Sequence, residues 1–214
     1  MIKGIVFDFW GTLMENGVNP SPLKQVRSMM NLDKLSFSAF VASFERSFMT
    51  KRFESLAEAF ESTCRNFNIR YNQRFIDDLI GLWNKNRLLA KPFTDTISTL
   101  EALRSKGLKL ALLSNTDAFS IEPLLEKYDM LKYFDSIVMS YKTGFLKTDK
   151  RSFEVILEEL GLEKDEVIMV GDSLQSDMLG AQNAGIKAVL VDRRNIMEFE
   201  NKVSSLEELK RFLE

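Results

Sequence analysis

The chain has 214 residues, of which 45% are hydrophobic and 28% charged, and its formal net charge is −2. This composition is typical of a soluble globular protein, and the near-neutral charge predicts neither a nucleic-acid partner nor binding to an anionic membrane. The single Cys64 excludes an internal disulfide, and the absence of histidine excludes Ser-His-Asp and Cys-His catalysis as well as His-ligated zinc or iron.

The chain begins with a short apolar segment that predicts a buried strand. Residues 5–7 are β-formers, and the run stops at Asp8, before the turn that Gly11 and Thr12 indicate. Apolar runs of this length fit a strand that is buried on both faces of a parallel sheet. A carboxylate at the end of such a strand needs a cation or hydrogen-bond donors. Asp8 is therefore the first candidate for chemistry, although Asp is also a common turn former.

Residues 16–90 carry a different pattern, with one predicted helix after another. Pro22 and Ser36 suit helix starts, and further helices are predicted over residues 56–67 and about 73–89. Four phenylalanines lie on one predicted helical face: Phe37, Phe40, Phe44 and Phe48. We expect these rings to pack within the helical segment, and the alternative is that some of them cover a substrate pocket.

After Pro92 the chain alternates between predicted helices and strands. The predicted strands are residues 108–113, 134–139, 167–170 and 188–191. The first predicted helix begins at a cap, Thr94 or Asp95, and ends at Gly107, and the later ones run through 121–125, from Asp149 to Gly161, from Asp177 to Gly185 and over 205–213. A loop is predicted at 141–147. Such alternation predicts βαβ units and a parallel sheet. The helical segment of roughly 75 residues is too long for a connection, so we interpret it as an inserted domain.

The predicted strands end in polar residues that carry the candidate chemistry. Asp8, Ser114-Asn115 and Asp172 follow three of them, and Lys147 lies in the loop after the remaining one. Because parallel strands end on one edge of a sheet, where ligands bind in open α/β folds, these side chains are expected to meet. Neighbouring carboxylates repel unless a cation lies between them, and oxygen ligands without His or Cys fit Mg²⁺. Lys147 and Ser114 would suit the oxygens of a phosphoryl group.

These segments resemble the four motifs of the haloacid dehalogenase superfamily of hydrolases. The motifs read VFDFWGTL at residues 6–13, LLSNTD at 112–117, Lys147 within GFLKTDKRSF, and VGDSLQSD at 170–177. The resemblance covers nearly the whole chain, since the helical segment resembles the cap that is inserted after the first motif in that family.

The resemblance implies an α/β fold, with a three-layer, Rossmann-like parallel sheet core at residues 1–14 and 91–214 and a helical cap domain at 15–90. Specificity would then come from cap residues near the first motif. Four basic residues of the cap could bind an anionic group, although a solvated surface is the simpler interpretation: Arg27, Arg46, Lys51 and Arg52.

The resemblance also implies a reaction and a metal. Asp8 would be the nucleophile of a phosphohydrolase that forms an aspartyl-phosphate intermediate with a small phosphorylated metabolite. Asp8 would share a Mg²⁺ with Asp172 and the carbonyl of Trp10, and Asp177 would support this acidic end of the site.

The phosphoryl group would be bound by residues of the first three motifs. Ser114 and the backbone amide of Asn115 would contact its oxygens, and Thr12 would assist by bracing the first turn. Lys147 would neutralise Asp8 and the transferring group, so that both remain charged before attack. Simpler interpretations stay open: Lys147 could be a solvated loop lysine, Ser114 and Asn115 could be turn formers, and Asp177 could be only a helix cap.

Position 10 departs from the family pattern. Phosphatases of the family usually carry an aspartate there as general acid and base, a role typically worth about 10²- to 10⁴-fold in rate, and the indole of Trp10 does not exchange a proton near neutral pH. True haloacid dehalogenases carry an aromatic residue at this position and need no metal, which makes 2-haloacid dehalogenation the main rival. Asp172 argues against that rival, because those enzymes lack an acid there. A third hypothesis is a catalytically reduced member that binds or regulates.

The remaining expectations concern partners and location. No apolar run approaches the roughly 20 residues of a membrane span, and the fold begins within the first residues, so no signal peptide is expected. We expect a cytoplasmic enzyme, monomeric or homodimeric, with a small phosphorylated substrate and with no nucleic-acid or membrane partner.

Overall fold

A six-stranded sheet with the strand order β5-β4-β1-β6-β7-β8 forms the centre of the computed structural model, which describes residues 1–213. The strands are β1 Gly4–Phe7, β4 Lys109–Ser114, β5 Ser136–Met139, β6 Val167–Gly171, β7 Lys187–Val191 and β8 Lys202–Val203. All five neighbouring pairs are parallel, which confirms the predicted sheet. β1 lies between β4 and β6, where Phe7 is in register with Leu112 and Val170.

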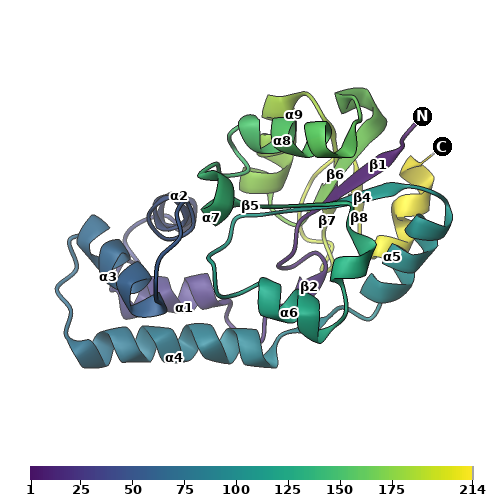
Figure 1. The fold of residues 1–214 in the computed structure, drawn as a ribbon. Coiled ribbons are helices and arrows are strands. Elements are labelled where there is room, and N and C mark those ends of the chain that lie inside the picture. Colours follow the sequence, from purple (N-terminus) through teal and green to yellow (C-terminus); the bar gives the residue numbers. More distant parts are fainter. Residues whose placement is uncertain (214) are drawn as a thin grey trace.

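Helices cover both faces of the sheet and give the predicted three-layer core (Figure 1). The helices on one face are α8 (Arg151–Leu160) and α9 (Leu179–Ala184), and those on the other are α5 (Thr96–Ser105), α6 (Glu122–Lys127) and η4 (Leu206–Phe212). Val6 packs with the first group, whereas Ile5 and Phe7 pack with the second. Successive strand residues point to opposite faces, so a strand covered on both faces requires the continuous apolar run that the sequence carries.

Four helices form a helical segment with a hydrophobic cluster of its own: α1 (Pro22–Met29), α2 (Phe37–Phe48), α3 (Leu56–Asn66) and α4 (Gln73–Leu89). The Ser36 hydroxyl caps α2 by accepting a hydrogen bond from the amide of Ala39. Phe40, Phe44 and Phe48 are buried, and the rings of the last two are stacked 4.9 Å apart, so most of the aromatic face packs inside the segment as predicted.

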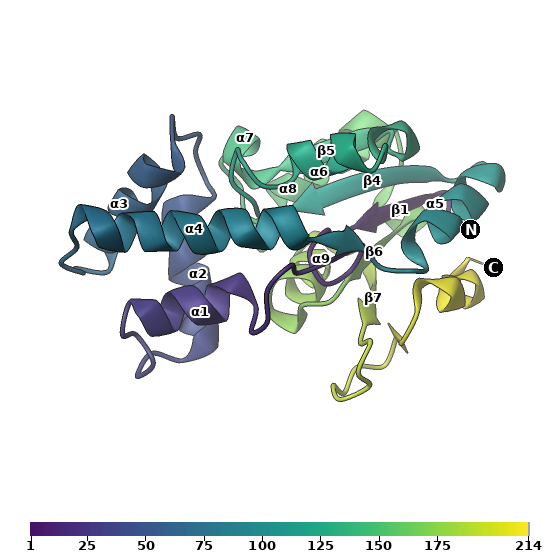
Figure 2. The ribbon, with the colours of Figure 1, turned by 90° about the horizontal axis from the view of Figure 1, so that it is seen from below.

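The two ends of the helical segment meet beside the sheet. β2 (Met14–Glu15) pairs antiparallel with β3 (Lys91–Pro92), and Figure 2 shows α4 running back from the other helices to this point. The assignment of residues 15–90 to a separate domain stays a prediction. Within residues 1–213, we find no helix of the length and apolarity that a bilayer crossing needs.

Several local predictions were wrong in detail. A short helix, α7 (Ser140–Thr143), replaces part of the predicted loop, and single 3-10 turns, η1 (Leu131–Tyr133) and η2 (Lys164–Glu166), precede β5 and β6. Asp177 lies inside a π-helical turn, η3 (Leu174–Met178), rather than in front of a helix. π-turns are frequent at functional sites, and this one directs Asp177 toward the ends of the strands. The predicted terminal helix is present as the 3-10 helix η4, and β8 was not predicted because it is too short to carry a periodic signal.

Asp95 lies at the start of α5 as predicted, but its side chain does not cap that helix. Its carboxylate accepts two hydrogen bonds of 3.0 Å from the Arg193 guanidinium and bonds of 2.9 Å from the Ser205 hydroxyl and the Leu206 amide. Asp95 therefore joins α5 to the segment after β7 and to the start of η4. Burial opposes ionisation, but these hydrogen bonds outweigh it and lower the pKa of Asp95.

We expect Asp95→Ala to lower the free energy of unfolding by roughly 2–4 kcal/mol, because Arg193 would lose its charged partner. Urea denaturation at neutral pH measures this difference. A carboxylate with a lowered folded-state pKa stabilises the fold above its unfolded pKa, and that contribution is lost as the pH falls through the folded value. The difference between the two proteins should therefore shrink as the pH drops below 3.8, the ordinary value for Asp. A difference that does not change with pH would contradict this explanation.

Candidate active site

The ends of two neighbouring strands bring the predicted acidic residues together. Asp8 follows β1, Asp172 follows β6, and Asp177 lies in the turn after β6. One carboxylate oxygen of each residue lies within 4.8 Å of the other two. Adjacent parallel strands end side by side, which explains why residues so distant in the sequence meet at this edge.

Lys147 is the cation of this cluster. Its ammonium group contacts Asp8 Oδ1 and donates a hydrogen bond of 2.7 Å to Asp177 Oδ1, and all three side chains are buried. Burial would lower the pKa of Lys147, but the charges of Asp177 and Asp8 outweigh burial and raise it above the ordinary value. Lys147 is therefore charged and compensates one of the three carboxylates.

The remaining negative charge is shared by Asp8 and Asp172. Burial raises the pKa of Asp8 to about 6, while the charge of Lys147 opposes the rise. Burial and then the charges of Asp8 and Asp177 raise the pKa of Asp172 well above its ordinary value. A divalent cation would relieve the repulsion behind these shifts, and a donor set of carboxylate oxygens suits Mg²⁺. The residues present therefore fit the predicted metal.

Two glycines allow the acidic side chains to approach the backbone. A Cβ atom on Gly11 would lie 2.0 Å from Asp172 Oδ2, and one on Gly171 would lie 2.3 Å from Asp177 Oδ2. Gly11 also has a φ of +83°, which residues with a Cβ rarely adopt. The turn after β1 thus lies directly against Asp172, and this turn carries the carbonyl of Trp10 that was predicted as a metal ligand.

The predicted phosphate-binding residues either contact Asp8 or line the same cavity. The buried Thr12 donates a hydrogen bond of 3.2 Å to Asp8 Oδ2, so it braces the carboxylate and is not among the residues that line the cavity. Ser114 ends β4 and lines the cavity, as does Asn115, whose Oδ1 accepts a 2.9 Å hydrogen bond from the Lys147 amide. The contacts of these three residues with a phosphoryl group stay predictions.

A cavity of about 900 Å³ lies between this edge of the sheet and the helical segment. Its size suits a small ligand. Asp8, Trp10, Lys147 and Asp172 form one side of it, and residues of α1, α2 and α4 form another. Of the four basic residues considered for anion binding, Arg46 lines the cavity, while the other three lie outside its wall: Arg27, Lys51 and Arg52.

The sequence analysis missed Glu45, which reaches the cavity from α2. Its Oε2 accepts a hydrogen bond of 2.8 Å from Asn115 Nδ2. Burial raises the pKa of Glu45 to about 7, although the charge of Lys147 and the hydrogen bond from Asn115 oppose the rise. The available signal was a carboxylate next to Phe44 on an aromatic helical face, and helical periodicity does not tell what lies across a cavity.

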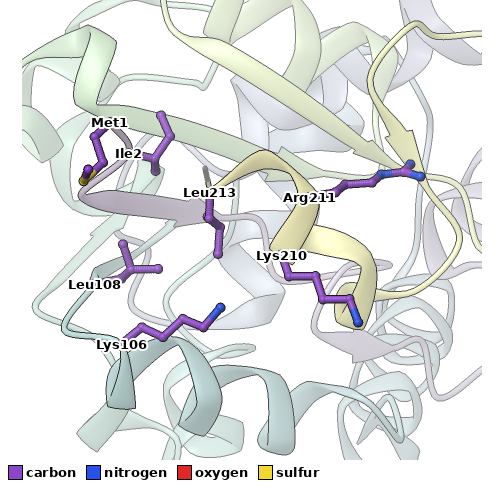
Figure 3. A pocket seen from close by; sticks show the side chains of 7 residues that line it. All are labelled: Met1, Ile2, Lys106, Leu108, Lys210, Arg211 and Leu213. Atoms are coloured by element: carbon purple, nitrogen blue, oxygen red, sulfur yellow. The ribbon is translucent and has the colours of Figure 1, made fainter.

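A second cavity, of about 550 Å³, lies at the opposite edge of the sheet, where the strands begin (Figure 3). Its lining residues come from the segments before β1 and β4 and from the end of the described chain: Met1, Ile2, Lys106, Leu108, Lys210, Arg211 and Leu213. Among the described residues that line it there is no carboxylate side chain and none of the predicted site residues. The candidate chemistry therefore belongs to the first cavity.

Comparisons with known proteins identify the family of this chain. The chain matches the family model of haloacid dehalogenase-like hydrolases over residues 2–185. It is 29% identical over 200 residues to a glyceraldehyde 3-phosphate phosphatase of Methanothermobacter thermautotrophicus, with 90% of this chain and 86% of that protein covered. It is 26% identical over 209 residues to an (S)-2-haloacid dehalogenase of Pseudomonas sp. (strain YL), with 92% and 86% covered.

The fold is also similar to those of solved structures. The crystal structure of a HAD phosphatase from Thermococcus onnurineus matches with a TM-score of 0.66 at 24% identity, covering 99% of this chain and 98% of that one. At this identity the likeness concerns the fold alone, and the family follows from the match over residues 2–185. The chain belongs to the haloacid dehalogenase-like hydrolase family.

Proposed function

We propose that this chain is a Mg²⁺-dependent phosphohydrolase that acts on a small phosphorylated molecule through a phosphorylated Asp8. The observation that carries the proposal is the charge of the site, where three carboxylates cluster around a single lysine that contacts two of them. The two negative charges that remain fit a divalent cation. The relative named as a glyceraldehyde 3-phosphate phosphatase supports the class of reaction.

Asp8 supplies the nucleophile in this proposal. Lys147 contacts one of its oxygens and Thr12 the other, so the carboxylate is held in one orientation at the cavity wall. A carboxylate oxygen attacks phosphorus, and the leaving oxygen departs on the opposite side. Lys147 reduces the repulsion between Asp8 and the phosphoryl oxygens.

The other predicted residues position the charged groups. Ser114 and the amide of Asn115 orient the phosphoryl oxygens at the end of β4. Asp8 and Asp172, with the Trp10 carbonyl, would hold Mg²⁺, which when bound supplies positive charge to the phosphoryl oxygens. Asp177 keeps Lys147 in place through their 2.7 Å hydrogen bond.

Metal removal tests the proposal with p-nitrophenyl phosphate as a generic substrate. After treatment with a chelator and its removal, we expect turnover to fall by roughly 10²-fold or more, because the carboxylates would repel the phosphoryl group. Added Mg²⁺ should restore the rate along a saturable curve. Absence of turnover at every Mg²⁺ concentration, on aryl and alkyl phosphates alike, would overturn the proposal.

Dehalogenation of 2-haloacids is a second candidate, which the aromatic residue at position 10 and the dehalogenase relative favour. In that reaction Asp8 would displace the halide without a metal. Halide release from 2-chloropropionate in the presence of a chelator would establish it. The position of Asp172 beside Asp8 speaks for the phosphohydrolase, since a metal-free displacement gains nothing from a second carboxylate there.

A further inference from the structure

We propose that Glu45 is the proton donor and acceptor of the hydrolysis: it protonates the leaving oxygen and later deprotonates the attacking water. This inference rests on the proposed phosphohydrolase function. It assigns to α2, in the helical segment, a catalytic role that Trp10 does not fill, because an indole does not transfer a proton near neutral pH.

Few other carboxyl groups of the cavity could transfer the proton in place of Glu45. Besides Asp8, six carboxyl groups line it: Glu15, Glu45, Asp117, Asp172, Asp177 and Asp192. Asp172 and Asp177 belong to the cluster around Lys147 and Asp8. Asp177 is bound to Lys147, and Asp172 would hold the metal ion, so neither would be free to exchange protons with a substrate.

Three of the other carboxyl groups are held elsewhere. Asp117 accepts hydrogen bonds from Trp83 Nε1, the Ser120 hydroxyl and the Phe119 amide, at 3.0, 2.6 and 2.7 Å. Asp192 accepts a 2.6 Å hydrogen bond from the amide of Met197, and Glu15 lies in β2 beside Lys91. Hydrogen bonds hold Asp117 and Asp192 within the protein, and Glu15 lies 3.8 Å from the ammonium group of Lys91.

Glu45 differs because half of its carboxyl group is free. Oε2 accepts from Asn115 Nδ2, while Oε1 makes no hydrogen bond within residues 1–213. Asn115 also accepts from the Lys147 amide, and the Lys147 ammonium contacts Asp8, so three contacts connect Glu45 to the nucleophile. Asn115 and Lys147 thus link the carboxyl group of Glu45 to that of Asp8.

Glu45 lies on the side of the cavity toward which the leaving oxygen would depart. Attack by Asp8 is in line, so the leaving oxygen departs away from the sheet edge and toward the helical segment, where α2 contributes Glu45 to the wall. Burial raises the pKa of Glu45 to about 7, so both its protonated and its ionised forms are populated at neutral pH.

The reaction has two steps, and Glu45 gives up a proton in the first and regains one in the second. In the first, an Asp8 oxygen bonds to phosphorus, the bond from phosphorus to the leaving oxygen breaks, and the Glu45 proton passes to that oxygen to give the alcohol. In the second, ionised Glu45 takes a proton from water, whose oxygen bonds to phosphorus while the bond to Asp8 breaks. Phosphate leaves, Asp8 is again a carboxylate, and Glu45 is again protonated.

Glu45→Gln tests this role with two substrates that differ in leaving group. For a simple alkyl phosphate, whose alkoxide needs a proton, we expect kcat/KM to fall by about 10²- to 10⁴-fold. For p-nitrophenyl phosphate, whose leaving group departs as a stable anion, kcat/KM should fall much less. Loss of the base should slow the second step, so stopped-flow measurements should show a burst of about one nitrophenol per enzyme.

A matched variant controls for the change in charge. Glu54→Gln alters an exposed glutamate in the loop after α2 that does not line the cavity, and it should keep wild-type kinetics on both substrates. The glutamine at position 45 can still accept the hydrogen bond from Asn115, so circular dichroism and the melting temperature should stay close to wild type. The pH profile of kcat/KM for the alkyl phosphate should lose its limb near pH 7 in Glu45→Gln.

Two results would overturn the role of Glu45 while leaving the phosphohydrolase function standing. One is wild-type kcat/KM of Glu45→Gln on the alkyl phosphate with an unchanged pH profile. The other is an equal loss on both substrates without a burst, which is the pattern of a general disturbance of the site. If the wild-type protein hydrolyses no phosphate ester at any Mg²⁺ concentration, the proposed function fails, and this inference fails with it.

Discussion

Asp8→Asn is expected to abolish turnover and to leave the fold intact. An amide is a poor nucleophile, and replacing the nucleophile of a covalent mechanism costs on the order of 10⁴-fold or more in kcat. The substitution keeps the shape of the side chain, so an amide oxygen can still accept from Thr12 or Lys147. Rates with p-nitrophenyl phosphate and Mg²⁺, together with urea denaturation of both proteins, measure the two halves of this prediction.

Asp129→Asn is the matched control for this variant. Asp129 is exposed, forms an ion pair with Lys132 and has a φ of 52°, a conformation that Asn also tolerates. We expect it to retain wild-type turnover. Wild-type activity in Asp8→Asn would show that another group attacks the substrate, and unfolding of that variant would show that Asp8 is needed for the fold.

Lys147→Met is expected to reduce both stability and turnover. The substitution would leave Asp8 and Asp177 buried without their shared cation, and breaking a buried ion pair in this way costs about 3–5 kcal/mol in the free energy of unfolding. Turnover should fall by on the order of 10³-fold, because Asp8 would meet the phosphoryl group without the charge that offsets their repulsion. Chemical denaturation in the presence of a chelator measures the stability change free of any metal.

The pH dependence of this variant identifies the cause of its instability. Carboxyl groups that have lost their cation take up a proton more readily, so the stability deficit relative to wild type should shrink as the pH is lowered from about 8 to about 5. Lys142→Met is the control, because Lys142 forms an exposed ion pair with Glu122, worth about 1 kcal/mol or less. A deficit of Lys147→Met that is constant with pH would point to lost packing instead.

The proposed chemistry divides the site between two parts of the chain. The sheet edge holds the nucleophile, the lysine and the carboxylates that suit a metal, and these residues follow from the strand ends. The proton-transferring group comes from the helical segment, across the cavity. Displacement of α2 would therefore separate Glu45 from Asn115 and interrupt catalysis without altering the acidic cluster.

The sequence by itself predicted the features that depend on local patterns. The period of the apolar residues predicted α4 with its observed bounds, Gln73–Leu89, and the apolar runs predicted β1 and β6 as buried parallel strands. Once the strands are parallel, their ends share one edge, so the meeting of Asp8 with Asp172 follows without knowledge of the loops. The π-turn around Asp177 and the two-residue strand β8 escaped prediction, because both are too short to show a repeating pattern.

Only the tertiary structure decided which side chains meet across elements. Asp95 was a predicted helix cap and instead binds Arg193 and the start of η4, and Glu45, which no sequence pattern singled out, lines the cavity of the candidate active site. The physical reason is that periodicity records which face of an element is apolar, whereas the partner of a polar side chain depends on how separate elements pack. That packing is set by the sum of many contacts along the chain, and no local segment contains it.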